Sequence, residues 1–189
     1  MKKTIVIFVI IVLFMASVAA TLHAKATHRV SVNFEMVEKG IGWIEFINTG
    51  AEPSAVKDYF MTHVAPTAGC KSIIRHWARF REWNNDIFYE WLAKAIGLSP
   101  TEEPLKKKDG TPTSLGNRRQ LWTNALKNTE RMKKHLKLLK SKNLEKKSID
   151  LAQKNLPPGT SLKADFHFVL FGHSTAFSVG DENGYDFLQ

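Results

Sequence analysis

The chain has 189 residues, 43% of them hydrophobic, with a net charge of +9 and a single cysteine. This length accommodates one domain with a substantial core, and nothing in the composition calls for a second. One cysteine excludes an intramolecular disulfide, so the fold cannot depend on one.

Residues 1–24 have the pattern of a secretory signal peptide. Basic residues occupy positions 2 and 3, an apolar run covers residues 4–18, and small residues follow at positions 19, 20 and 24. Cleavage after Ala20 or Ala24, or within the small-residue stretch 24–26, would start the mature chain near Thr21 or Lys25. The pattern predicts export to a periplasmic or extracellular location. The alternative is an uncleaved anchor, because the run approaches the length that spans a bilayer.

A strand and a short helix are predicted next. Apolar and polar residues alternate over residues 28–36, which is typical of a half-buried strand. Glycines at 40 and 42 are expected to end that pattern, before an ambiguous apolar run at residues 43–47. From Ser54 the apolar spacing becomes helical, with Pro53 at the entrance and Pro66 just past the end.

Two further helices are predicted before residue 100. One carries the apolar stripe from Ile73 to Phe80, and the other spans residues 87–96 with an Asn cap at 84 or 85 and Gly97 after its end. Arginines alternate with aromatic residues around Trp77, which could indicate stacking on a nucleic-acid base or a sugar. Aromatic residues at helical spacing are more typical of a core, and the sequence favours that interpretation.

Residues 99–114 are predicted to be a loop because they contain three prolines and little apolar material. A long helical pattern with Trp122, Met132, Leu136 and Leu139 on one side follows it. A break near residues 141–143 precedes a helix over residues 144–155. Pro157 to Gly159 ends this helix, and strands are expected at residues 164–171 and 175–179, with another beginning at Tyr185 after a turn at residues 180–184.

These elements predict an α+β fold that is mostly helical, with a small sheet formed by the N-terminal strand and the C-terminal strands. Residues 25–189 would then form a single domain, incomplete at its C-terminus. If Phe168 is a core residue, Phe168→Asp should cost several kcal/mol, as expected for an unpaired buried charge.

The positive charge belongs to one region. Residues 105–147 contain fourteen Lys or Arg and three acidic residues, a net charge of +11, which leaves −2 for the rest of the chain. Such a helical region can contact an anionic envelope component, or it can be an ordinary solvated surface. Nucleic acid is not expected as a partner, because no nucleic-acid module accompanies the charge. No oligomer is predicted.

Several stretches carry a resemblance to a known family. They are LPPGT, FHFVLFGHSTAFSVG and GYDFLQ near the C-terminus and, more loosely, CKSIIRHWARFREWNNDIFYEWL and NLEKKSIDLAQKNLPP upstream. Together they resemble the N-terminal portion of a little-characterised family of proteins classed as zinc-dependent peptidases. The resemblance implies that the family's His-Glu-x-x-His helix would follow Gln189, and that zinc would be bound there.

The chain itself has no such motif. Its histidines stand at positions 23, 28, 63, 76, 135, 167 and 173, and no two have the spacing of a zinc-binding pair on a helix. His167, His173 and Asp181 could meet around the terminal hairpin, and Cys70 could pair with His63 or His76 as a nucleophile. A buried, inert cysteine is favoured. No catalytic, cofactor-binding or metal-binding residue is therefore assigned.

Three hypotheses follow. The first is an exported, non-catalytic scaffold portion of a zinc-peptidase-like protein, inactive as this chain. The second is an exported binding module whose basic helical region at residues 105–147 contacts an anionic envelope component. The third is a self-contained enzyme that uses Cys70 or a pair of histidines, for which the sequence offers no constellation.

Overall fold

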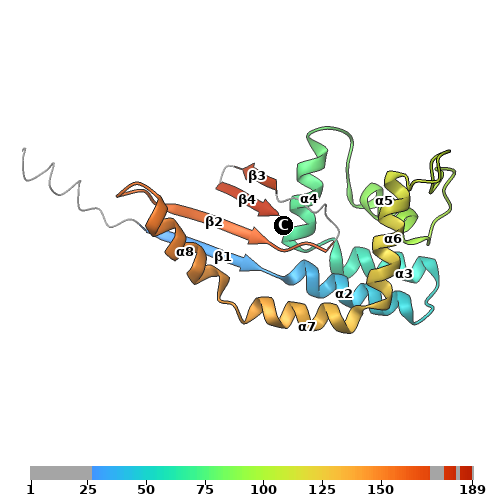
Figure 1. Cartoon of the computed structure of the whole chain (residues 1–189), viewed down its shortest axis with the longest axis horizontal. Helices are drawn as coiled ribbons and strands as arrows, with labels where there is room; N and C mark the ends of the chain where they lie inside the picture. Colours follow the sequence, from blue (N-terminus) through green and yellow to red (C-terminus); the bar gives the residue numbers. More distant parts are fainter. Residues whose placement is uncertain (1–26, 171–176, 182–183, 189) are drawn as a thin grey trace, which may run out of the picture.

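A computed structural model describes residues 27–170, 177–181 and 184–188, with side chains described for 27–170. Within these residues the protein is mostly helical, with one small sheet, so the predicted α+β class is confirmed (Figure 1). The elements are β1 His28–Asn33, α2 Glu35–Asn48, α3 Pro53–Tyr59, the π-helical turn η1 Phe60–Val64, α4 Ala68–Ala78, α5 Asn85–Ile96, α6 Ser114–Lys127, α7 Thr129–Lys140, α8 Leu144–Asn155, β2 Leu162–His167, β3 Phe177–Asp181 and β4 Gly184–Leu188.

The sheet has the strand order β1-β2-β4-β3. β1 and β4 both run parallel to β2, whereas β3 pairs antiparallel with β4. In this register Asn33 pairs with His167, and His167 pairs with Leu188. The carboxyl ends of the three parallel strands therefore meet at one edge of the sheet.

The first strand is shorter than predicted, and the glycines at 40 and 42 do not end an element. The Asn33 side chain accepts a hydrogen bond from the Glu35 amide at 2.8 Å, and α2 begins there. Met36, Ile41 and Ile44 then face the core at helical spacing. Gly42 is useful within this helix, since an added Cβ would lie 3.0 Å from the Tyr59 hydroxyl. Burial of one helical face outweighs the weak helix propensity of two glycines.

The core is built around Trp43 of α2. Its indole nitrogen donates to the Val56 carbonyl at 3.0 Å, and its ring meets those of Phe60, Tyr89 and Trp122 edge-on at 5.2 to 6.3 Å. These contacts bring α3, η1, α5 and α6 onto α2. The helices predicted in residues 54–96 are confirmed, although the stretch from Ser54 continues from α3 into the π-helical turn η1.

The predicted caps of α5 are also present. The Asn84 side chain accepts from the Ile87 amide at 2.9 Å, and Gly97 follows the helix with φ of 99°. That positive φ is the left-handed conformation that glycine adopts without steric cost.

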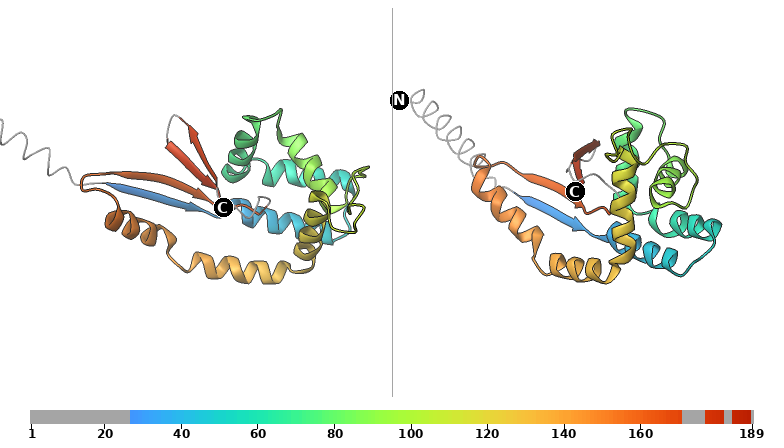
Figure 2. Two further views of the ribbon diagram at one scale, coloured as in Figure 1. Left: turned by 45° about the horizontal axis from the view of Figure 1, so that its top comes forward. Right: turned by 45° about the vertical axis from the view of Figure 1, so that its right-hand side comes forward.

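The long helical pattern beyond residue 114 forms two helices instead of one. Asn128 leaves the helical conformation with φ −127° and ψ 29°, which separates α6 from α7. α7 then packs beside α2, and α8 lies against β1. Two further views show α8 and α7 following one another along one side of the molecule (Figure 2).

The predicted strand at 164–171 is displaced and shortened. β2 covers Leu162–His167, and Phe168 makes only one more ladder contact, donating to the Asn33 carbonyl at 2.9 Å. Because β1 ends at Asn33, that strand offers no partner beyond this point, and Val169 and Leu170 pack against the helical core instead. The strand expected from Tyr185 is confirmed by β4. Of the strand predicted at 175–179, residues 177–179 lie in β3, and residues 171–176 and 182–183 lie outside the described residues.

Candidate functional site

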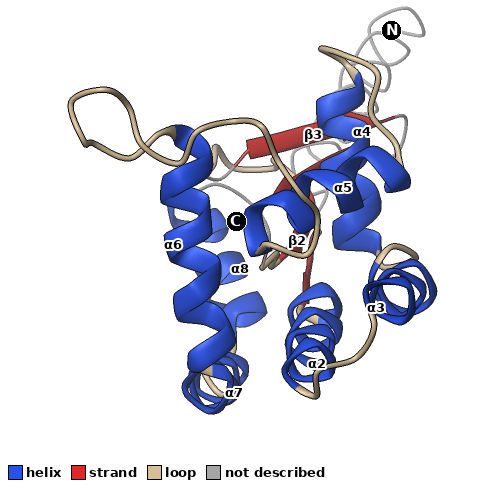
Figure 3. Cartoon of the chain, turned by 90° about the vertical axis from the view of Figure 1, so that its right-hand side faces the viewer, coloured by secondary structure: helices blue, strands red, loops and turns tan. Residues whose placement is uncertain are grey.

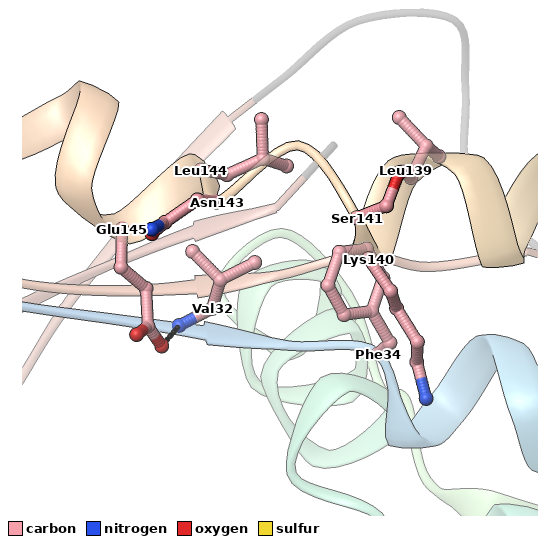
Figure 4. Close-up of a pocket in the computed structure, with 8 residues that line it drawn as sticks. All are labelled: Val32, Phe34, Leu139, Lys140, Ser141, Asn143, Leu144 and Glu145. Atoms are coloured by element: carbon pink, nitrogen blue, oxygen red, sulfur yellow. Dashed lines mark hydrogen bonds between the residues drawn. The ribbon is translucent and has the colours of Figure 1, made fainter.

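A groove of about 390 Å³ lies between β1 and the corner that joins α7 to α8 (Figure 4). Its walls combine apolar side chains with a few polar ones. The lining residues are Val32, Phe34, Leu139, Lys140, Ser141, Asn143, Leu144 and Glu145.

The groove exists because α8 closes the outer edge of β1. The Glu145 carboxylate accepts a hydrogen bond from the Val32 amide at 3.0 Å. Asn143 has a left-handed backbone, with φ 46°, and its side chain caps α8 by accepting from the Lys146 amide at 3.3 Å. A carboxylate on the unpaired amide protects an edge strand from pairing with another chain.

The floor of the groove is aromatic. Phe34 stacks on Phe168 with ring centroids 4.7 Å apart, and the Lys140 ammonium lies 5.9 Å from the Phe34 ring centroid. Lys140 also forms an ion pair with Glu38. The Ser141 hydroxyl donates to the Leu138 carbonyl at 2.8 Å. The groove therefore holds a cation paired with Glu38, a carboxylate bonded to the Val32 amide, and a hydroxyl that is already bonded.

The carboxyl edge of the parallel strands is the second feature with functional geometry. Ligands of parallel sheets bind outside the carboxyl ends of their strands. His167 ends β2 between Asn33 of β1 and Leu188 of β4. Its Nδ1 atom is buried and has no hydrogen-bond partner among the residues that the structure describes.

Cys70 and the two histidines that the sequence grouped with it differ in their surroundings. Cys70 is buried, and burial raises the pKa of its thiol to about 12. His63 is exposed beside the Tyr59 ring, at a centroid distance of 4.5 Å. His76 contacts the rings of Trp77 and Phe80. Its pKa is lowered, mainly by burial and to a lesser extent by the nearby Arg79 guanidinium. A protonated, enclosed thiol is a poor nucleophile at neutral pH.

The zinc that the family resemblance implies has no ligand set among the residues that the structure describes. There, no three His, Cys, Asp or Glu side chains lie close enough to hold a metal ion. His28 has a structural role, since its Nδ1 accepts from the Leu162 amide at 3.2 Å. His173 and the side chain of Asp181, which the sequence grouped with His167, lie outside the described side chains.

The cluster of aromatic and arginine residues between α4 and α5 belongs mainly to the core. Trp83 packs against Phe88 and Trp91, and the Arg81 guanidinium lies 4.3 Å from its ring centroid. A base or sugar that stacked on Trp83 would have to displace these contacts. The predicted apolar stripe was wrong at Phe80, which is 71% exposed because α4 ends at Ala78.

The basic residues of α7 and α8 divide into two sets. The inward set is paired: Lys133 with Glu45 and Glu130, and Lys140 with Glu38. Lys146 is also paired, with Asp150 one turn further along the exposed side of α8. The outward set is exposed and makes no ion pair with any residue in the described ranges. We call this set the outer basic face; it consists of Arg131, Lys134, Lys137, Lys142, Lys147 and Lys154.

The sequence indicated a basic region but not this division. The predicted basic region grouped all cations of residues 105–147 together, and it ended before Lys154. The spacing of the cations along each helix contains the signal for this division. The cations of the outer face are offset from the inward-facing Met132, Leu136 and Ala152.

Among the described residues, none of the helices combines the length and apolar content needed to cross a bilayer. Comparisons with family models, with curated proteins and with solved structures found no match.

Proposed function

We propose that this protein is an exported, non-catalytic binding module that contacts an anionic surface of the cell envelope through the outer basic face. The observation that supports this most directly is the division of the cations. Lys133 and Lys140, which face α2, are paired with the carboxylates of Glu45 and Glu38, whereas the outer six have no such partner within the described chain.

The energetics favour an extended anionic surface as the partner. A Lys or Arg close to an anionic membrane contributes about 1 kcal/mol to binding, so several cations on one side produce appreciable affinity together. The strength should fall steeply with salt, because exposed charges are screened over about 8 Å at physiological ionic strength. An exported protein would meet such a surface, whereas it rarely meets nucleic acid.

The test removes three positive charges from α7. The protein is the full chain, expressed and processed in an exporting host. The variant Arg131→Gln, Lys134→Gln, Lys137→Gln should bind vesicles of phosphatidylglycerol and phosphatidylcholine about a hundredfold more weakly than the parent, at about 1 kcal/mol per cation. Co-sedimentation at low and at physiological salt measures the partition coefficient.

A matched control removes the same charge from another place. Lys106, Lys107 and Lys108 precede α6, while α7 follows its other end, and α6 is about 21 Å long (Figure 3). Changing these three lysines to Gln should alter binding much less. Equal weakening by both variants would show that net charge alone matters, and no weakening by either would refute the proposed function.

A second candidate function is the scaffold portion of a zinc-peptidase-like protein. It is supported by the sheet, whose parallel strands end together around His167 with an unbonded, buried Nδ1 among the described residues. The purified chain should then bind no stoichiometric zinc and hydrolyse no peptide. A His-Glu-x-x-His sequence encoded just downstream of codon 189, together with chelator-sensitive cleavage by the extended chain, would support this candidate. One tightly bound zinc and chelator-sensitive cleavage in the present chain would contradict it.

Export is part of both proposals. Mass spectrometry of protein from the producing cell should show a mature chain that begins near Thr21 or Lys25. An N-terminal segment retained in the membrane fraction would indicate the anchored form. A soluble cytoplasmic protein that keeps residues 1–20 would contradict export.

A further inference from the structure

Two exposed leucines lie within the outer basic face. Leu138 of α7 is 54% exposed and Leu151 of α8 is 62% exposed. Each follows a lysine of that face by four residues, Lys134 in α7 and Lys147 in α8. Residues four apart are neighbours on one side of a helix, so each leucine lies beside a cation.

The leucine of α7 points away from the protein. Leu136 is partly buried on the side of α7 that faces α2, where Lys133 and Lys140 reach Glu45 and Glu38. Lys134 and Leu138 stand two residues to either side of Leu136, about 200° around the helix from it. An apolar side chain at the centre of a solvent-facing cationic side buries little surface within the fold, so it contributes little to stability.

α8 repeats the arrangement. Its inner side is marked by Ala152, which is buried, and by the Glu145 contact to β1. Lys147, Leu151 and Lys154 are exposed. Lysine stems can lie along an adjacent apolar side chain while the ammonium reaches a polar layer, which suits a surface that is charged outside and apolar beneath.

The start of the described chain lies near the same helix. The Thr27 amide donates to the Ser161 hydroxyl at 3.2 Å, six residues after α8 ends at Asn155. The described chain therefore begins at the end of the domain where α8 finishes.

We infer that the anionic partner is a lipid bilayer, and that Leu138 and Leu151 insert below its headgroups while the outer basic face binds the lipid phosphates. This inference rests on the proposed function and specifies the partner. Interfacial helices bind through apolar burial and charge together, whereas a soluble polyanion requires only the charge.

Leucine variants distinguish binding to the phosphates of a lipid bilayer from binding to those of a soluble polyanion. Leu138→Ser with Leu151→Ser, made in the full chain, should weaken binding to vesicles of phosphatidylglycerol and phosphatidylcholine by about tenfold, because two partly exposed leucines lose apolar burial. Binding to soluble polyphosphate should not change. Leu121→Ser is the matched control: Leu121 is 69% exposed on α6, outside the outer basic face, and its loss should affect neither ligand.

Site-specific labelling measures insertion directly. Cys70 is buried with its thiol pKa raised to about 12, so an environment-sensitive fluorophore will label Leu138→Cys selectively in the folded chain. Emission should shift to the blue when vesicles are added, and the equally labelled Leu121→Cys should not shift. Circular dichroism confirms that each variant is folded.

The outcomes distinguish the inference from the proposed function. Loss of vesicle binding in the charge variant with no change in the leucine variant, and no shift of the label at residue 138, would overturn insertion but keep an anionic partner. Undiminished binding in the charge variant would overturn both. Equal weakening of polyphosphate and vesicle binding by the leucine variant would also overturn insertion.

Discussion

The helical core and the side formed by α7, α8 and β1 differ in what they bury. The largest fully buried side chains, including Trp43, Phe60 and Phe88, all come from residues 36–92. α7 contains no buried residue, and α8 buries only Ala152. The core is therefore held by apolar packing, whereas the α7–α8 side combines a few partly buried apolar side chains, such as Met132, with ion pairs and hydrogen bonds at its inner surface.

This difference explains why the α7–α8 side can carry exposed, unpaired cations. Apolar burial contributes about 25 cal/mol per Å² and tolerates few changes, so a core face has little freedom to carry unpaired charge. Surface ion pairs contribute about 1 kcal/mol or less each. Regions with few buried contacts open locally at lower free energy, so the α7–α8 side should be the more dynamic of the two.

Removing the centre of the core should have the largest effect. Trp43→Ala should lower the free energy of unfolding by about 3–5 kcal/mol, because it leaves a cavity and unpairs the Val56 carbonyl. Urea denaturation followed by circular dichroism measures the change. Trp91, which is only partly buried, provides a control whose truncation should cost less. A loss below about 1 kcal/mol for Trp43→Ala would show that the core is not centred on this residue.

Phe168 tests the boundary between the two regions. It is only partly buried and stacks on Phe34, so Phe168→Asp should cost about 2 kcal/mol instead of the larger penalty expected for a core position. Phe80→Asp changes an exposed phenylalanine and should cost under about 0.5 kcal/mol. Equal losses in the two variants, measured by urea denaturation, would contradict this placement.

Cys70 makes the stability of the core dependent on pH. Its thiol pKa is about 12 in the folded protein and 9.0 ordinarily, so the unfolded state loses the proton first as pH rises. The contribution is complete below pH 9 and is lost progressively toward pH 12, with about 1 kcal/mol lost by pH 10. Cys70→Ala should lack this component. Unfolding curves at pH 8 and pH 10 that change equally in both proteins would rule it out.

Glu145 tests how the α7–α8 side is attached. Glu145→Gln should cost about 1 kcal/mol or less, because an amide oxygen accepts from the Val32 amide more weakly than a carboxylate does. Hydrogen exchange at Val32 should accelerate more than exchange at Trp43. Acceleration of both by the same factor would mean that the two regions open as one unit.

The two candidate sites differed in how far the sequence predicted them. The basic region was visible as a count of charges, but counting could not show that Lys133 and Lys140 are paired while Arg131 and Lys134 are not. Pairing depends on Glu45 and Glu38, which lie about ninety to a hundred residues earlier in the chain. The carboxyl edge around His167 was not predicted, because parallel pairing between residues so distant leaves no local signal.

The sequence by itself determined the elements whose cause is local. Pro53 at the start of α3, the Asn84 cap and Gly97 after α5 follow from backbone chemistry within a few residues, and the helical apolar spacing located most of the helices. Tertiary structure decided where β1 gives way to α2, where β2 stops and which leucines remain exposed. Each of these depends on burial against distant partners, since a strand continues only while a neighbouring strand pairs with it and a glycine-containing helix persists only when its apolar face is covered.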